Sequence, residues 1–208
     1  MITLYGAPKT RSLRIVWMME EIEQPYDYCS INLMIGEGRK PEFQAINPAG
    51  KVPVMKDGDL ILTESAAIIT YLGDKFKQSS LVPTAGSALR GKYDQWCYFG
   101  LPELEQPLWT MAKHQFALPE KYRAEDIIKT SEWEYQRALT VLSQGLADKE
   151  YILGSTFSAA DIILFQILQW GKANQQSVEQ ANLLHYINRI KQRPALQRAQ
   201  QREKPSIE

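Results

Sequence analysis

The chain has few of the residues that build metal sites or disulfide frameworks. Its 208 residues include two cysteines, Cys29 and Cys97, and two histidines, His114 and His185. The cysteines lie far apart and form neither a C-x-x-C motif nor a metal-ligand spacing, which argues against a disulfide framework and a zinc site. Two histidines are also too few for a multi-histidine metal site. We therefore expect no metal.

The sequence also lacks an excess of charge and any long apolar run. Lys plus Arg and Asp plus Glu number 24 each, which removes the electrostatic case for nucleic acid or an anionic membrane as a partner. No apolar run approaches the roughly 20 residues of a membrane span, and no basic-then-apolar leader opens the chain. We therefore expect a cytoplasmic protein with no nucleic acid and no membrane partner.

The most informative stretch starts at Asn47 and reads NPAGKVPVMKDGDLILTESAAI. Pro53 stands inside a short apolar strand, where it cannot donate to a sheet ladder, and its peptide bond is a candidate for the cis form. Such a geometry leaves the backbone N–H and C=O of Val52 free to pair with an extended peptide. The pair Asp57-Gly58 then predicts a hairpin that links Val52–Met55 to Leu60–Leu62 as antiparallel strands.

The same stretch ends in a helix start at Thr63-Glu64-Ser65. The first turn of a helix offers unpaired N–H groups to a carboxylate, while Glu64 can hold an ammonium group. A free α-amino acid head carries both charges. The simpler alternative is that Glu64 and Ser65 only cap the helix and that Pro53 is an ordinary edge proline. A peptide-pairing edge followed by this helix start suits a small extended peptide with a free amino-acid end.

This order of motifs resembles the glutathione-binding half of the glutathione S-transferase family, and the similarity runs over nearly the whole chain. The family has a cis-proline after a hydrophobic residue and Glu-Ser at the start of the next helix. The resemblance implies that Val52 pairs through its backbone with the cysteinyl part of glutathione, with Pro53 in the cis form. It implies further that Glu64 and Ser65 hold the γ-glutamyl head and that Lys51 lies near the glycyl carboxylate.

The patterns predict an α/β domain followed by an all-α domain. Residues 2–5 and 26–31 alternate as strands around a helix at 13–22, and a right-handed crossover makes these strands parallel. With a short helix at 41–45, the hairpin and the helix that follows, the first domain is thioredoxin-like, βαβ-α-ββα, over residues 1–78. A polar linker at 79–86 leads to an all-helical bundle domain at 87–208. Its helices are expected at 87–112, 120–145, 159–173 and 179–192, with a short one after Pro194.

Chemistry is expected on the first loop, which ends a parallel strand and begins a helix. A thiol has a pKa of about 8.5, and a hydroxyl donor, a helix N-terminus and a guanidinium all favour the thiolate. Thr10, Arg11 and Ser12 offer these groups. In transferases of the serine type, the active hydroxyl lies four residues before an arginine, as Thr10 does here before Arg14. Thr10 is the first choice, Ser12 the second, and Tyr5 the rival, because other classes of the family use a tyrosine.

No cysteine lies in this loop. By the same resemblance, members that form a mixed disulfide with glutathione carry a cysteine there, so thiol-disulfide exchange is disfavoured.

Two features of the helical domain have different predicted roles. Ser158 and Asp161, preceded by Phe157, form a capping box with a hydrophobic staple, which is a structural signal that the family also carries. An aromatic stretch with two interrupting prolines contains Trp109, Met111 and Phe116, which the resemblance places in an electrophile pocket.

The sequence thus predicts a homodimeric glutathione S-transferase, a detoxification enzyme that conjugates glutathione thiolate, its co-substrate, to small hydrophobic electrophiles. Two alternatives remain open. One is a non-catalytic glutathione-binding module for interaction or stress response. The other is a glutathione-dependent peroxidase, isomerase or dehalogenase, which would share the first site and differ in the second.

Overall fold

The computed structural model describes residues 1–204, and the chain divides into two compact units. The first unit joins Met1–Val82 to the chain from Gln192 onward, and the second is Pro83–Lys191. The division after Val82 falls within the predicted linker. Across residues 1–204, no helix has both the length and the apolar character that spanning a membrane requires.

The first unit contains a four-stranded mixed sheet. Strands β1 (Ile2–Gly6), β2 (Tyr26–Ser30), β3 (Val54–Asp57) and β4 (Leu60–Thr63) lie in the order β2-β1-β3-β4. Strand β1 runs parallel to β2 and antiparallel to β3, so that Tyr5 is paired with Cys29 on one side and with Val54 on the other. This topology confirms the predicted thioredoxin-like domain.

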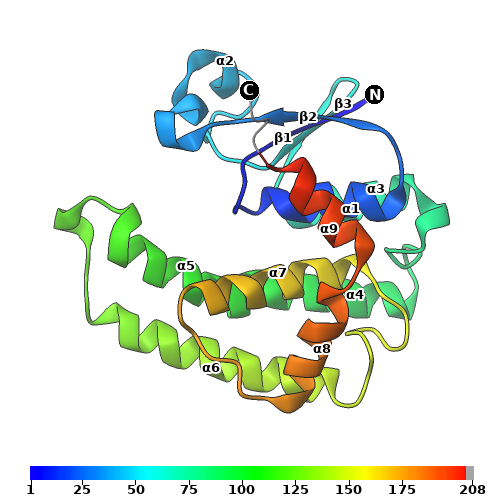
Figure 1. Cartoon of the computed structure of the whole chain (residues 1–208), viewed down its shortest axis with the longest axis vertical. Helices are drawn as coiled ribbons and strands as arrows, with labels where there is room; N and C mark the ends of the chain where they lie inside the picture. The colour runs from blue at the N-terminus through cyan, green and yellow to red at the C-terminus, as the bar shows by residue number, and fades with distance from the viewer. Residues whose placement is uncertain (205–208) are drawn as a thin grey trace. The chain divides into compact units, whose positions relative to one another are not determined.

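The helices of this unit lie on both faces of the sheet (Figure 1). Helix α1 (Ser12–Ile22) packs against β1, α3 (Ser65–Lys75) and α9 (Pro194–Arg202), whereas the short α2 (Pro41–Gln44) lies on the other side. These neighbours cover the nearly continuous apolar run of α1, whose apolar side chains with no exposed surface are Ile15, Val16, Trp17, Met18 and Met19. The alternation of β1 separates the two faces, with Leu4 fully buried and Tyr5 partly exposed.

Helix α9 differs from the sequence-based division, which placed residues 87–208 in one helical domain. The helix packs along α1 in the first unit instead. Arg193 makes a two-pronged ion pair with Glu21, at 2.6 and 2.7 Å, and Arg198 Nε donates to Glu20 Oε2 at 3.0 Å. These partners are separated by more than 170 positions, so local sequence patterns do not indicate them.

The second unit is all-helical, as predicted. Its α-helices are α4 (Ala88–Phe99), α5 (Gln106–Ala112), α6 (Ile127–Leu146), α7 (Ala159–Ala173) and α8 (Ala181–Lys191). Ten of the 15 residues of α7 are buried. A π-helical segment at Gly100–Glu105 contains Pro102 and connects α4 to α5, where Pro107 occupies the first turn. A proline has no N–H and clashes with the preceding turn, which accounts for the altered helical pitch.

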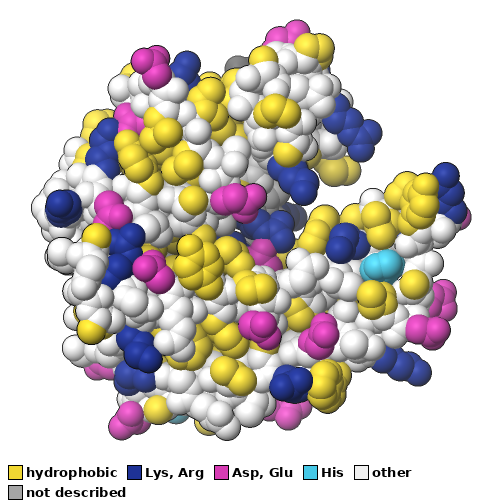
Figure 2. Space-filling model, turned by 180° about the vertical axis from the view of Figure 1, so that it is seen from behind, with side chains coloured by type: hydrophobic (Ala, Val, Ile, Leu, Met, Phe, Trp, Pro, Cys, Tyr) yellow, Lys and Arg dark blue, Asp and Glu magenta, His cyan; other side chains and the backbone are white. Residues whose placement is uncertain are grey.

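Helix α6 begins at Ile127, later than the predicted start at residue 120. The preceding residues form a single 3-10 turn, Glu120–Tyr122, and then a loop. The Arg123 side chain holds this loop by donating to the carbonyl oxygens of Leu118 at 2.8 Å and Phe116 at 3.0 Å. On the face shown in Figure 2, charged side chains of both signs are interspersed, in keeping with the zero net charge.

Candidate functional site

The loop between β1 and α1 is closed by two hydroxyl groups. Thr10 Oγ1 donates to the carbonyl oxygen of Ala7 at 2.7 Å and lies 2.8 Å from Ser12 Oγ. The backbone N–H of Ala7 donates to Ser12 Oγ at 3.1 Å, and the N–H of Ser12 donates to Thr10 Oγ1 at 3.1 Å. The first turn of α1 therefore presents a hydrogen-bonded hydroxyl pair rather than two independent side chains.

The two hydroxyls differ in accessibility. Ser12 has no exposed surface, whereas Thr10 is half-buried. Thr10 Oγ1 donates its hydrogen to the Ala7 carbonyl, and Ser12 Oγ accepts the Ala7 N–H. In the contact between the two hydroxyls, the Ser12 hydroxyl is therefore the donor and Thr10 Oγ1 the acceptor. An incoming sulfur can therefore contact Thr10, while Ser12 acts from behind it.

Arg14 connects this loop to the start of α3. Its guanidinium is fully buried, and Nη1 donates to Ser65 Oγ at 3.0 Å. In the sequence, Arg14 only aligns the loop with the family pattern, and it was not predicted as a binding residue. The available signal was a single charged residue within an apolar helical run, because a buried arginine needs hydrogen-bonding partners.

The segment before β3 has the predicted cis bond but a later strand start. The Val52–Pro53 peptide bond is cis, and β3 begins at Val54 rather than at Val52. Asn47 fixes the approach to this segment: its Nδ2 donates to the Lys51 carbonyl at 2.7 Å, and its Oδ1 accepts the Ala49 N–H at 3.1 Å. Val52 thus lies outside the strand ladder, at the end of a loop held by a nearly buried amide.

Glu64 has an unusual backbone. Its φ and ψ are 65° and 111°, immediately before Ser65 opens α3, and its side chain is exposed. Positive φ in a residue other than glycine is uncommon and tends to occur at functional sites. Lys51 is exposed and Arg11 is half-buried. The structure thus brings Arg14 to Ser65, next to Glu64.

Tyr5 has a different environment from the hydroxyl pair. Its ring packs on Phe43 of α2, with centroids 6.1 Å apart, on the face of the sheet opposite Leu4. Burial, with a smaller contribution from Cys29, raises the pKa of the Tyr5 phenol above its usual value. The ring contact gives Tyr5 a packing role, while the raised pKa keeps its hydroxyl protonated.

The residues predicted for the electrophile pocket differ in exposure. Trp109 is half-buried and packs on Trp170, with centroids 6.3 Å apart. Met111 is only 2% exposed and belongs to the core of the second unit, whereas Phe116 is 65% exposed. The three side chains therefore do not form one continuous exposed wall.

The cap of α7 is a buried network around one carboxylate. Asp161 Oδ2 accepts the N–H and the hydroxyl of Ser158, each at 2.8 Å. Its Oδ1 accepts the Ile152 N–H and the Tyr186 hydroxyl, also each at 2.8 Å. The structure therefore contains the predicted capping box, and all of the contacts of Asp161 are structural.

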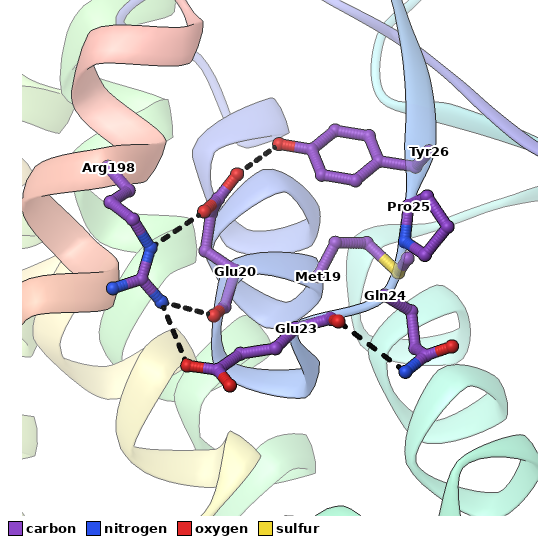
Figure 3. A pocket seen from close by; sticks show the side chains of 7 residues that line it. All are labelled: Met19, Glu20, Glu23, Gln24, Pro25, Tyr26 and Arg198. Carbon is purple, nitrogen blue, oxygen red and sulfur yellow. Dashed lines mark hydrogen bonds and ion pairs between the residues drawn. The ribbon is translucent and has the colours of Figure 1, made fainter.

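A separate pocket of about 340 Å³ lies at the opposite end of α1 (Figure 3). Its lining residues are Met19, Glu20, Glu23, Gln24, Pro25, Tyr26 and Arg198. The carboxylate of Glu20 is bound by the Tyr26 hydroxyl at 2.7 Å and by Arg198 at 3.0 Å. The polar groups of the pocket thus pair with one another, and none belongs to the predicted glutathione site. Residues 1–204 contain no group of three or more His, Cys, Asp or Glu that could hold a metal ion.

Two domain families known from other proteins match this chain. The glutathione S-transferase N-terminal domain family matches residues 1–74, and the C-terminal domain family matches residues 106–194. The chain belongs to the glutathione S-transferase family. It is 32% identical over 165 residues to glutathione S-transferase F10 of Arabidopsis thaliana, covering 77% of this chain and 76% of that protein.

Solved structures of the family are also similar to this glutathione S-transferase. A glutathione transferase from Methylococcus capsulatus shares 25% identity with a TM-score of 0.87, covering 98% of each chain. A family member from Pseudomonas fluorescens, with two glutathione molecules bound, shares 25% identity with a TM-score of 0.82, covering 96% of this chain and 92% of that chain. The family comparisons support a glutathione transferase enzyme, and the non-catalytic and peroxidase-type alternatives are not favoured.

Proposed function

We propose that this glutathione transferase ionises bound glutathione at the Thr10–Ser12 hydroxyl pair and adds the thiolate to small hydrophobic electrophiles. The observation that carries the proposal is the 2.8 Å contact between these two hydroxyls at the first turn of α1. Thr10 is the partly accessible member and Ser12 the fully buried one. This arrangement supplies a donor to sulfur together with a helix N-terminus, and both favour an anion.

Glutathione would dock along the edge formed by Val52. In the proposal, the cysteinyl N–H and C=O pair with the peptide group of Val52, which precedes the cis-proline and lies outside the ladder. Glu64 accepts the γ-glutamyl ammonium group, and Ser65, held by Arg14, binds its carboxylate. Lys51, together with Arg11 near the loop, supplies positive charge for the remaining carboxylate and the sulfur.

The proposed reaction is ionisation of the glutathione thiol followed by attack of the thiolate on the electrophile. The thiol proton passes to solvent, and each unit by which the thiol pKa falls requires about 1.4 kcal/mol of preference for the anion. The Thr10 hydroxyl turns from the Ala7 carbonyl to the sulfur and donates to it. The sulfur lone pair forms a bond to an electrophilic carbon, and a leaving group departs with the electron pair of the broken bond.

The proposed electrophile site is apolar. We propose that the half-buried Trp109 and the exposed Phe116 contact apolar substrates, and that Met111 supports them from the core. An apolar wall with few polar groups accepts varied hydrophobic molecules, which fits a role in detoxification. No metal takes part in this proposal.

The proposal includes a cytoplasmic homodimer, which the family membership supports. Cys29 and Cys97 are free thiols, and Cys29 is exposed, as suits a reducing compartment. Light scattering on the purified protein should give about twice the mass of one chain, and a monomer would contradict the assignment.

A panel of variants tests the catalytic assignment. Thr10→Ala should lower kcat/KM with a hydrophobic model electrophile by about 100-fold or more, in line with the loss of one preorganised donor to a developing or stabilised anion. Thr10→Ser should retain most of the activity, and Tyr5→Phe should leave it within about threefold of wild type. Unchanged turnover in Thr10→Ala together with a large loss in Tyr5→Phe would transfer the role to the tyrosine.

A further inference from the structure

Behind the hydroxyl pair lies a second cluster of polar side chains that the proposed function does not use. Gly6 ends β1, and a Cβ atom placed on it would lie 2.8 Å from Ser12 Cβ and 2.9 Å from the hydroxyl oxygen of Tyr28. Both side chains therefore pack against the same glycine from different elements. The absence of a side chain at Gly6 allows the Tyr28 phenol to approach Ser12.

The Tyr28 hydroxyl is buried yet unpaired. Within residues 1–204, neither this oxygen nor Oε1 of Glu203 has a hydrogen-bond partner. Glu203 follows α9 directly and is 6% exposed, so two neighbouring buried groups retain unused hydrogen-bonding capacity. Buried polar groups are normally paired, and exceptions often have a functional explanation.

The protonation states of the two groups make both of them donors. Burial raises the pKa of Glu203 to about 8, so its carboxyl group keeps a proton at neutral pH. Burial, together with the nearby Glu203, also raises the pKa of the Tyr28 phenol, which stays protonated. Ser12 has no contact with solvent, so only protein groups can supply it with a further donor.

We propose that Tyr28 and Glu203 are positioning residues for thiol activation: their oxygens, unpaired in this structure, close into a donor chain from Glu203 through Tyr28 and Ser12 to Thr10 when glutathione binds. When the Thr10 hydroxyl turns from the Ala7 carbonyl to the sulfur, Ser12 donates to Thr10 and Tyr28 donates to the second lone pair of Ser12. Glu203 in turn donates to Tyr28. Hydrogen bonds in such a chain polarise one another, so the terminal donor binds an anion more strongly.

This inference rests on the proposed function, because it concerns the thiolate formed at Thr10. It also gives α9 a role beyond packing, since Glu203 caps this helix and α9 is held on α1 by Arg193 and Arg198. Helix α9 would then contribute to a site built mainly by the first domain.

Ultraviolet titration of glutathione bound to the full-length protein tests the donor chain. Tyr28→Phe removes one oxygen and should raise the pKa of the bound thiol by about half a unit or more, which is about a threefold loss of thiolate below that pKa. The dissociation constant for glutathione should change less than twofold. The matched control is Tyr26→Phe, which removes a hydroxyl from the same strand whose partner is Glu20, and it should leave the thiol pKa unchanged.

Two variants at Glu203 complete the test. Glu203→Gln keeps an N–H donor and should retain the wild-type thiol pKa, whereas Glu203→Leu should raise it as Tyr28→Phe does. If wild type forms the thiolate and neither Tyr28→Phe nor Glu203→Leu changes the pKa of the bound thiol, the donor chain is overturned and the proposed function is left intact. Failure of wild type itself to form a thiolate would overturn the proposed function.

Discussion

Nη1 of Arg14 donates to Oγ of Ser65 at 3.0 Å, which links the first turn of α1 to the first turn of α3. Both residues are buried, and 51 positions of chain separate them. In the proposed site, one end of this link lies beside the hydroxyl pair and the other beside Glu64. The guanidinium therefore sets the distance between the place where sulfur reacts and the place where the γ-glutamyl head binds.

Ser65→Ala tests this link. Loss of a hydrogen bond to a buried charged group should lower the free energy of unfolding by about 1.5–3 kcal/mol. The KM for glutathione should rise as well, because the same hydroxyl is proposed to bind its carboxylate. Ser65→Thr, which keeps a hydroxyl, is the control and should retain both properties to a greater extent. An unchanged KM in Ser65→Ala would remove Ser65 from the binding site.

Gly6→Ala tests the close approach of Tyr28 and Ser12. The added methyl group would lie under 3 Å from both side chains, and overpacking of this kind costs about 1–3 kcal/mol. We expect a lower melting temperature and a loss of activity, since Ser12 must move. The control is Gly91→Ala in α4, where a Cβ meets nothing within 4 Å. That change should be neutral or slightly stabilising, because alanine favours a helix.

Asp161→Asn tests the capping network separately from catalysis. An amide cannot accept all four of the hydrogen bonds that the Asp161 carboxylate accepts, so we expect a loss of about 2 kcal/mol in unfolding free energy. Turnover per folded molecule should be unchanged. Denaturant unfolding beside steady-state kinetics measures both quantities, with the exposed Asp148→Asn as control. A fall in kcat without a fall in stability would give Asp161 a chemical role.

The buried carboxyl group of Glu203 should make the protein less stable as pH rises. Its ordinary pKa is 4.5, and burial raises it to about 8 in the folded protein. Between these values the folded state holds a proton that the unfolded state has released, so the free energy of unfolding falls as pH rises. Glu203→Gln should flatten this decline between about pH 5 and 8. Parallel curves for wild type and variant would contradict the buried, neutral carboxyl group.

The features that the sequence predicted well are those set by neighbouring residues. The cis form before Pro53, the Asp57-Gly58 hairpin and the cap at Ser158 each follow from the backbone chemistry of a few adjacent residues. The fold class followed from strand and helix periods combined with the family resemblance. The start of α6 was placed too early, because the Arg123 side chain holds a loop where the residue pattern alone allows a helix.

The features that the sequence did not reveal depend on contacts between distant segments. Docking of α9 on α1 relies on arginines whose partners are near the other end of the chain. The position of Tyr28 beside Ser12 depends on strand register and on the missing side chain of Gly6. Thr10 and Ser12 are close in sequence, yet they looked like alternatives there because a residue pattern does not give side-chain orientation; in the structure they form one hydrogen-bonded pair.

The most direct test of the central claim is the ultraviolet absorbance of the thiolate in the glutathione complex, followed from pH 5 to pH 10 for wild type and Thr10→Ala. The account predicts that the bound thiol ionises below the ordinary value of about 8.5 in wild type, and that its pKa returns toward that value in Thr10→Ala. Calorimetry at each pH confirms that both proteins hold the tripeptide. A thiolate band of equal strength and midpoint in the two proteins would contradict the role assigned to Thr10.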